Sequence, residues 1–131
     1  MIVDASAILA ILLNEPEREA FSDLLTAAPD PSVLSPVNFL EVALRVDRGD
    51  MPEAADKLEQ ILATLNIVLG EVTAPQALLA REAFQKFGKG RHAARLNLGD
   101  CFAYAMAKER HEPLLFKGND FSQTDIKAAI W

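Results

Sequence analysis

Short apolar runs alternate with longer amphipathic segments along this chain, and this alternation constrains the fold more than any other feature. Strands are expected at 1–4, 33–34, 67–69 and 114–116, and a fifth, edge strand at 126–130. The segments between them carry apolar residues at helical spacing. The pattern predicts an α/β fold in which helices flank a central, mostly parallel sheet of four to five short strands, joined by right-handed crossovers.

Prolines, glycines and capping residues delimit the helices between these strands. Ser6 is a candidate cap for the first helix, and Pro16 fits the first turn of the second, which runs to about Ala27. Further helices are expected at 36–46, 52–65, 73–87 and 97–112. In the helix at 36–46, Glu41 lies beside an apolar stripe that is formed by Val37, Leu40, Ala43 and Leu44.

Residues 1–131 are expected to form one domain, because a chain of this length with 50% hydrophobic residues can build a single core. The longest apolar run, 7–13, is far shorter than the roughly 20 residues that span a bilayer. Cys101 is the only cysteine, which excludes an internal disulfide and fits a reducing compartment. The sequence therefore predicts a cytoplasmic protein with no membrane association.

Four acidic residues occur in apolar company or within a few residues of an apolar strand: Asp4, Glu41, Asp100 and Asp120. An unpaired carboxylate in such a setting costs several kcal/mol or becomes protonated. Asp4 ends the first strand, Asp120 follows the fourth, and Asp100 lies in the first turn of the helix that precedes the fourth strand. Because the carboxyl ends of parallel strands share one edge, these acids are expected to converge there, joined by Glu41 if its helix begins at that edge. A shared divalent cation would offset both the free-energy cost of burying these carboxylates and the repulsion between them.

Each acid also has an ordinary structural explanation when it is taken alone. Asp100 could interact with the helix dipole, Asp4 and Asp120 could be turn residues, and Glu41 could reach solvent. Their joint placement at one predicted sheet edge favours a common site.

The segment 86–95, KFGKGRHAAR, is basic and contains no acid. Lys89, Arg91, His92 and Arg95 are candidate contacts to phosphate beside the acidic site, and a solvated loop is the alternative interpretation. The net charge of −6 argues against a protein that coats nucleic acid nonspecifically.

The segments MIVDASAILAILLNEPE, NFLEVAL, FGKGRHAARLNLGDCFAYAMAK and PLLFKGNDFSQTDI together resemble the PIN-domain ribonucleases, in particular the VapC toxins of bacterial toxin–antitoxin pairs. The similarity extends from Met1 to about Ile126. The resemblance implies a single PIN-like domain in which Asp4, Glu41, Asp100 and Asp120 form a catalytic acidic quartet that binds Mg²⁺, or Mn²⁺, with Asp4 and Asp100 most directly tied to the metal.

The resemblance also implies roles for other residues. Ser6 corresponds to a supporting hydroxyl that would hydrogen-bond the acids or their waters, and Asp125 is expected to be a structural cap and not a ligand. Lys89, Arg91, His92 and Arg95 would contact the RNA backbone.

The implied function is that of a metal-dependent endoribonuclease toxin of a type II toxin–antitoxin system, which hydrolyses RNA phosphodiester bonds with a metal-activated water. A VapB-like antitoxin would neutralise it by covering apolar faces of the helices at 7–27 and 37–48. A homodimer is also expected.

Other function classes fit parts of the sequence. Strand-end aspartates with Lys117 after a late strand also occur in acid-pocket phosphatases and phosphoacceptor domains, although Asp4 has no second Asp two residues on and the third strand ends at Gly70. A module that mainly binds another protein is compatible with a toxin. A histidine acid–base mechanism would have only His92 and His111 to use, and His111 fits a helix C-cap.

Overall fold

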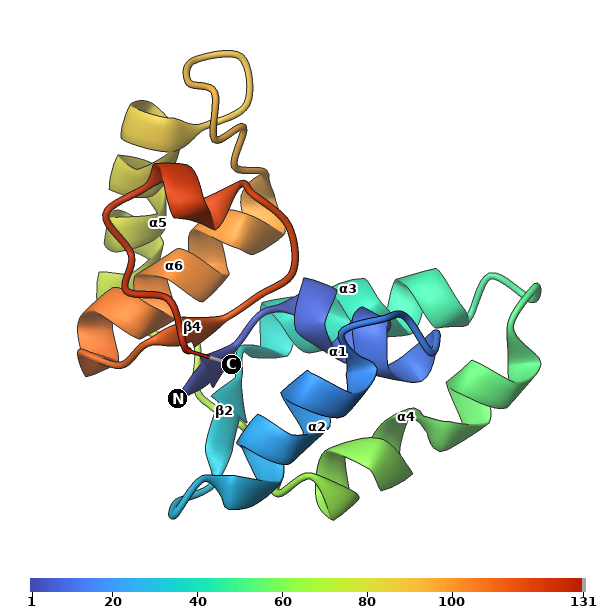
Figure 1. Cartoon of the computed structure of the whole chain (residues 1–131). Coiled ribbons are helices and arrows are strands. Elements are labelled where there is room, and N and C mark those ends of the chain that lie inside the picture. Colours follow the sequence, from blue (N-terminus) through green and yellow to red (C-terminus); the bar gives the residue numbers. More distant parts are fainter. Residues whose placement is uncertain (131) are drawn as a thin grey trace.

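The computed structural model describes residues 1–130 and places a small sheet between two groups of helices (Figure 1). The strand order is β3-β2-β1-β4, and all neighbouring strands are parallel. The strands are β1 (Ile2–Val3), β2 (Ser32–Leu34), β3 (Ile67–Leu69) and β4 (Leu114–Leu115). The predicted α/β class with a parallel sheet is confirmed.

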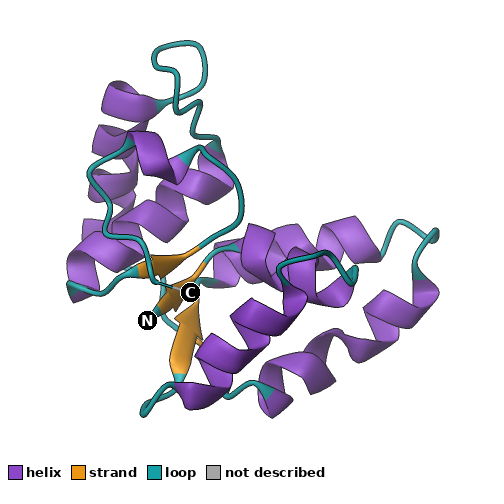
Figure 2. Ribbon diagram, in the orientation of Figure 1, coloured by secondary structure: helices purple, strands orange, loops and turns teal. Residues whose placement is uncertain are grey.

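A pair of helices connects each strand to the next (Figure 2). The helices are α1 (Ala5–Leu12) and α2 (Arg18–Ala27), α3 (Pro36–Val46) and α4 (Pro52–Thr64), and α5 (Ala74–Phe87) and α6 (Leu98–Arg110). A short 3-10 helix, η1 (Phe121–Gln123), follows β4. The helices expected at 73–87 and 97–112 begin at the N-caps Thr73 and Asn97, and the predicted C-cap His111 ends α6 with a left-handed φ of 54°.

The sheet separates two hydrophobic cores, because successive strand residues face opposite sides. Ile2, Val33 and Leu114 pack with α5 and α6. The next residue of each strand, Val3, Leu34 and Leu115, packs with α1 to α4. Helices therefore cover both faces of the sheet and leave its carboxyl edge open at the centre.

Three sequence expectations at element ends are wrong. Asp4, and not Ser6, is the N-cap of α1, because the Asp4 carboxylate accepts the backbone N–H of Ser6. Pro16 lies in a turn before α2, whose N-cap is Glu17. Within residues 1–130 the segment 126–130 forms no fifth strand, since only Ala128 makes a bridge, to Leu114.

The buried side of α3 also differs from the expected stripe. Asn38, Val42 and Val46 face the interior, whereas Leu40 and Leu44 are 55% and 63% exposed. The helix is packed between α1, α4 and α6, so a polar residue, Asn38, occupies a core position and two leucines remain at the surface.

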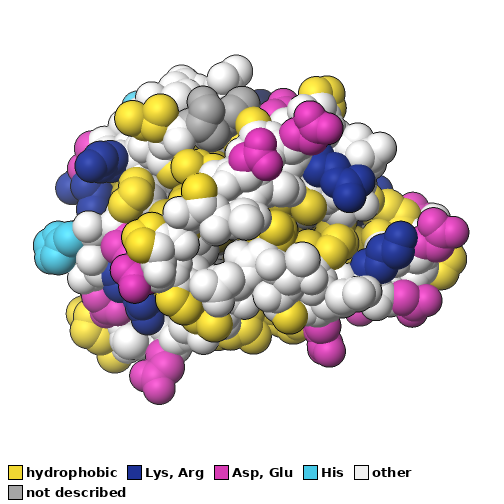
Figure 3. Space-filling view, turned by 60° about the horizontal axis from the view of Figure 1, so that its bottom comes forward, with side chains coloured by type: hydrophobic (Ala, Val, Ile, Leu, Met, Phe, Trp, Pro, Cys, Tyr) yellow, Lys and Arg dark blue, Asp and Glu magenta, His cyan; other side chains and the backbone are white. Residues whose placement is uncertain are grey.

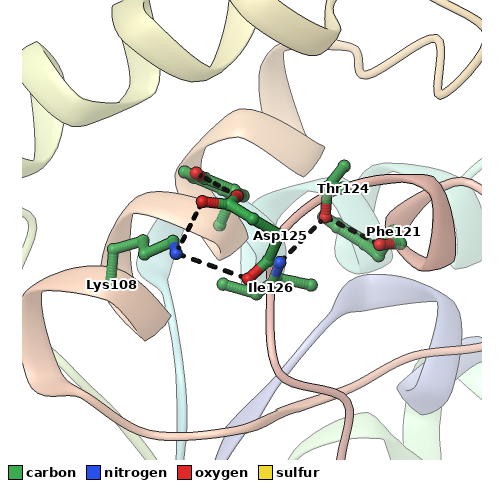
Figure 4. A network of polar contacts seen from close by, with 6 residues as sticks. Lys108, Phe121, Thr124, Asp125 and Ile126 are labelled. Atoms are coloured by element: carbon green, nitrogen blue, oxygen red, sulfur yellow. Dashed lines mark hydrogen bonds and ion pairs between the residues drawn. The ribbon is translucent and has the colours of Figure 1, made fainter.

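The segment after η1 is fixed to α6 by polar contacts (Figure 4). Asp125 accepts hydrogen bonds from the Tyr104 hydroxyl at 2.6 Å and from Lys108 Nζ at 3.0 Å. Thr124 Oγ1 donates to the carbonyl of Phe121 at 2.7 Å and accepts the N–H of Ile126 at 3.2 Å. These contacts fit the structural role predicted for Asp125. Within residues 1–130, no helix is both long and apolar enough to cross a membrane.

Candidate functional site

The candidate site lies at the carboxyl end of β1, the central strand where the chain changes direction across the sheet. From β1 the chain builds outward through β2 to β3, and it then returns through α5 and α6 on the opposite face to add β4 on the other side. Ligand sites of open parallel sheets form at such a switch point. A pocket of about 420 Å³ occupies this position; its lining residues are Asp4, Ala5, Ser6, Leu9, Glu41, Leu44, Arg45, Arg48 and Asp100.

Asp4 forms the floor of this pocket. It directly follows β1 and is 3% exposed. Its Oδ2 accepts hydrogen bonds from the backbone N–H of Ser6 at 3.0 Å and from Ser6 Oγ at 2.6 Å. Its Oδ1 is buried and has no hydrogen-bond partner within residues 1–130. Burial raises the pKa of Asp4, and the hydrogen bonds from Ser6 oppose this rise.

Ser6 joins the ends of two strands. Its hydroxyl donates to Asp4 after β1 and accepts the backbone N–H of Lys117, which lies just beyond β4, at 3.0 Å. The Lys117 side chain forms ion pairs with Glu15 and, at 3.2 Å, with Glu17. The start of α1 is therefore held to the loop that leads from β4 to Asp120.

Glu41 approaches Asp4 from α3 and lies against the first turn of α6. A Cβ at Gly99 would be 2.5 Å from Glu41 Oε1, so a side chain at that position would displace the Glu41 carboxylate. The fully buried Asn38 donates from Nδ2 to the carbonyl of Gly99 at 3.0 Å and to Glu41 Oε2 at 3.4 Å. Burial raises the pKa of Glu41, and the nearby negative charge of Asp4 raises it further.

Asp100 enters from the first turn of α6, where it forms a capping box with Asn97. Its Oδ2 accepts the backbone N–H of Asn97 at 3.0 Å, and Asn97 Oδ1 accepts the N–H of Asp100 at 2.9 Å. Burial raises the pKa of Asp100 to about 7. The hydrogen bond from Asn97 opposes this rise, and the negative charges of Asp4, Glu41 and Asp120 add to it. The capping hydrogen bond lowers the pKa, so a capping role alone does not explain why the pKa of Asp100 is raised.

Asp120 lies at the rim of the site and does not line the pocket. A turn at Gly118, with φ of 100°, leads to it, and it precedes η1 without a side-chain cap hydrogen bond. Its negative charge raises the pKa of both Asp4 and Asp100. The structure therefore brings Asp4, Glu41 and Asp100 together in one pocket and Asp120 within electrostatic range.

The donor set is one that a hard divalent cation prefers, since it consists of carboxylate oxygens, one of them buried and unpartnered. Within residues 1–130, no group of three or more acidic, histidine or cysteine side chains is arranged tightly enough to hold a metal ion by itself. Mg²⁺ commonly takes one or two carboxylates directly and keeps several waters. The residues present fit such an arrangement.

The basic residues Lys89, Arg91, His92 and Arg95 are all exposed, on the loop between α5 and α6 that stands out at one end of the molecule (Figure 1). Arg91 lies over the ring of Phe84 at 5.9 Å, and the rings of His92 and Phe87 are 5.3 Å apart. The loop ends at the cap of the helix that carries Asp100, but none of its residues lines the acidic pocket. Their contact with RNA stays a prediction.

Sequence reasoning missed three residues of this region: Asn38, Arg45 and Arg48. Asn38 and Arg45 lie three and four residues from Glu41, and this spacing was the available signal, because residues at these intervals share one helix face. Arg48 lies in the turn after α3, where helical spacing gives no signal.

The chain matches the family described as PIN domain over residues 1–127. Ribonuclease VapC28 of Mycobacterium tuberculosis is 44% identical over 131 residues, which cover 99% of this chain and 98% of the relative. Ribonuclease VapC42 of the same species is 40% identical over 130 residues, covering 98% of each.

Solved structures show the same fold. M. tuberculosis VapC20, a toxin that cleaves the sarcin–ricin loop, superposes with a TM-score of 0.76 at 18% identity, covering 98% of this chain and 97% of the other. A chain of a toxin–antitoxin complex from Klebsiella pneumoniae superposes with a TM-score of 0.66 at 20% identity, covering 95% and 92%. The full-length match in sequence and fold shows that this chain belongs to the PIN-domain family and, within it, to the VapC branch.

Proposed function

We propose that the protein is a metal-dependent endoribonuclease that acts as the toxin of a type II toxin–antitoxin pair. The observation that carries the proposal is the buried Asp4 carboxylate, whose Oδ1 lacks a partner within residues 1–130 and which shares a pocket with Glu41 and Asp100. Relatives that cover nearly the whole chain are named ribonucleases, which supports RNA as the substrate. The family assignment favours this function over phosphotransfer.

Asp4 and Asp100 would hold Mg²⁺ or Mn²⁺, with Glu41 and Asp120 acting through the water shell. A divalent cation in this place supplies a Lewis acid that activates water and neutralises charge on the phosphodiester. Such hydrolysis needs no side-chain nucleophile, so neither His92 nor His111 has to take part.

The residues of the chain prepare the site for this chemistry. Ser6 holds Oδ2 of Asp4 through two hydrogen bonds, and Oδ1 has no hydrogen-bond partner within residues 1–130. Asn97 orients Asp100 through Oδ2, and Asn38 holds Glu41 against the start of α6. Raised pKa values at Asp4, Glu41 and Asp100 reflect carboxylates that gain from a nearby cation.

The test is cleavage of total cellular RNA by the wild type and by Asp4→Asn, each with Mg²⁺, Mn²⁺ or EDTA. Discrete fragments are expected only with the wild type and a metal. Asp56→Asn is the matched control, since Asp56 is an exposed acid on α4 outside the pocket. Equal cutting by wild type and Asp4→Asn, or metal-independent cutting, would contradict the proposal.

A VapB-like antitoxin is the proposed protein partner, supported by the fold shared with a chain of a toxin–antitoxin complex. A groove of about 370 Å³ at the end of α1 and the start of α4 offers a place for it, with apolar lining from Leu12, Leu13, Met51, Pro52 and Ala54. Figure 3 brings α2 and α4 toward the viewer and shows hydrophobic side chains along the middle of that face, with Lys and Arg mostly near its ends.

The partner proposal is tested with the antitoxin encoded beside this protein. Met51→Glu should weaken the complex, measured by calorimetry, and Leu78→Glu on α5 should not. Equal effects of both substitutions would remove the groove as the antitoxin surface. The homodimer stays a prediction, checked by light scattering of the toxin alone.

A further inference from the structure

One wall of the acidic pocket is basic. Glu41, Leu44, Arg45 and Arg48 all line it from α3 and the turn that follows. Leu44 and Arg45 follow Glu41 by three and four residues and share its face of the helix. At about 1.5 Å of rise per residue, Arg45 lies about 6 Å farther along the helix axis than Glu41. Arg48 lies in the turn just after α3, which ends at Val46, so α3 and this turn present two guanidinium groups to the pocket that also receives Glu41.

Within residues 1–130, neither arginine is neutralised by the acids of the pocket. Arg48 is exposed and has no hydrogen bond or ion pair there. Arg45 has only a loose ion pair, from Nη1 to Asp50 Oδ2 at 3.6 Å, and this nitrogen makes no hydrogen bond within the described chain. Both guanidinium groups therefore retain donors for an anion.

An RNA strand is repelled by a protein of net charge −6 whose cleavage site is itself acidic, so its phosphates need a local positive surface. Guanidinium groups suit this because they stay charged and grip phosphate oxygens with paired donors. We propose that Arg45 and Arg48 bind the RNA backbone on the α3 side of the acidic pocket, with Arg48 as the principal contact.

This inference rests on the proposed ribonuclease function and extends it to the path of the strand. The basic loop of Lys89, Arg91, His92 and Arg95 leads into the first turn of α6, which carries Asp100, and Arg45 and Arg48 line the pocket beside Glu41. The strand runs from the loop across Asp100 and Asp4 to Arg48. The scissile phosphate then lies at the acids while its neighbours are held at both ends.

The experiment measures binding separately from cleavage. A fluorescent single-stranded oligoribonucleotide is titrated with Asp4→Asn protein without metal over a series of salt concentrations, alone and combined with Arg48→Ala or Arg45→Ala. Arg48→Ala should weaken binding about tenfold and lower the slope of log affinity against log salt by about 0.7, as expected for one lost phosphate contact. Arg110→Ala, which removes a charge at the opposite end of α6, should change neither.

Kinetics and folding provide the second readout. In the otherwise wild-type protein, Arg48→Ala should raise KM with little change in kcat, and Arg48→Lys should restore part of the affinity. The melting temperature of Arg48→Ala should equal that of the wild type, because the exposed Arg48 side chain makes no hydrogen bond or ion pair within residues 1–130.

The outcomes separate this inference from the proposed function. If the wild type cleaves RNA, Asp4→Asn does not, and Arg48→Ala matches Arg110→Ala in affinity, salt slope and KM, the inference is overturned and the ribonuclease proposal stands. If Arg48→Ala weakens only the complex with the antitoxin, Arg48 binds the antitoxin and not RNA, and the inference is overturned as well. If the wild type cleaves no RNA and Asp4→Asn binds none, both fail together.

Discussion

Gly99 and Glu41 are in such close contact that any side chain at position 99 would displace the Glu41 carboxylate. A Cβ at Gly99 would lie 2.5 Å from Oε1 and 2.6 Å from Oε2 of Glu41. Asn38 reinforces the contact, since its Nδ2 donates to the carbonyl of Gly99 at 3.0 Å. Because Gly99 of α6 has no side chain, Glu41 of α3 has room to reach Asp4 and Asp100.

Gly99→Ala should lower RNA cleavage, because the new methyl group displaces the Glu41 carboxylate from its place beside Asp4 and Asp100. The displaced atoms end a flexible side chain, so the cost in stability should be small, and the gain of about 1 kcal/mol that alanine brings over glycine in a helix opposes it. Urea unfolding measures the stability, and RNA cleavage measures the activity. A Gly99→Ala protein that cleaves RNA as fast as the wild type would refute the contact.

The metal-free protein should lose stability as the pH rises from about 4 to about 7. Unfolded Asp100 releases its proton near its ordinary pKa of 3.8, whereas in the folded protein the pKa is about 7. The folded state therefore binds more protons between these values, and the free energy of unfolding falls with rising pH over this window. Asp4 and Glu41, whose pKa values are also raised, act in the same direction.

Melting temperatures in EDTA check this pH dependence. Asp100→Asn should flatten the decline, because one of the groups that takes up protons on folding is removed. His92 and His111 are present in both proteins and cancel in the comparison. Parallel curves of melting temperature against pH for wild type and Asp100→Asn would show that folding does not raise the pKa of Asp100.

Ser6→Ala should cost stability and activity together. The substitution leaves Asp4 Oδ2 without its side-chain donor and the N–H of Lys117 without its acceptor. Losing a partly buried hydrogen bond to a charged group costs roughly 1–3 kcal/mol. Ser122→Ala is the control, since the exposed Ser122 hydroxyl donates only to the carbonyl of Asn119, at 2.7 Å. Equal unfolding free energies for the two variants would contradict a linking role for Ser6.

The fold was predictable because its signals are local. Apolar runs bounded by proline and glycine located β2 and β3, and Thr73 and Asn97 identified the starts of α5 and α6. The convergence of the acids followed from the rule that ligand sites form at the carboxyl edge of parallel strands. The failures lie where tertiary contacts decide: the last segment pairs with β4 only at Ala128 while side chains fix it to α6.

The missed parts of the site depend on distances between helices that sequence does not state. Asn38 reads as an interruption of an apolar helix, and only the packing of α3 on α6 shows that it bridges Gly99 and Glu41. Arg45 and Arg48 read as surface charges, and only the position of α3 relative to β1 places them on the pocket. Helix periodicity shows which residues share a face, but not what that face meets.

Mg²⁺ or Mn²⁺ should raise the melting temperature of the wild type. Substitution of an acid that binds the metal should reduce this rise, and substitution of an acid outside the site should not. A cation that binds only the folded state stabilises by mass action, and here it also relieves repulsion among buried carboxylates. Asp100→Asn should shrink the metal-induced rise.

Asp125→Asn is the matched control for this measurement. It should lower the melting temperature itself, because Asp125 accepts from Tyr104 and Lys108, yet keep the full metal-induced rise. An equal rise in wild type and Asp100→Asn would remove Asp100 from the metal site. A rise lost in Asp125→Asn would instead make Asp125 part of that site, against its contacts with α6.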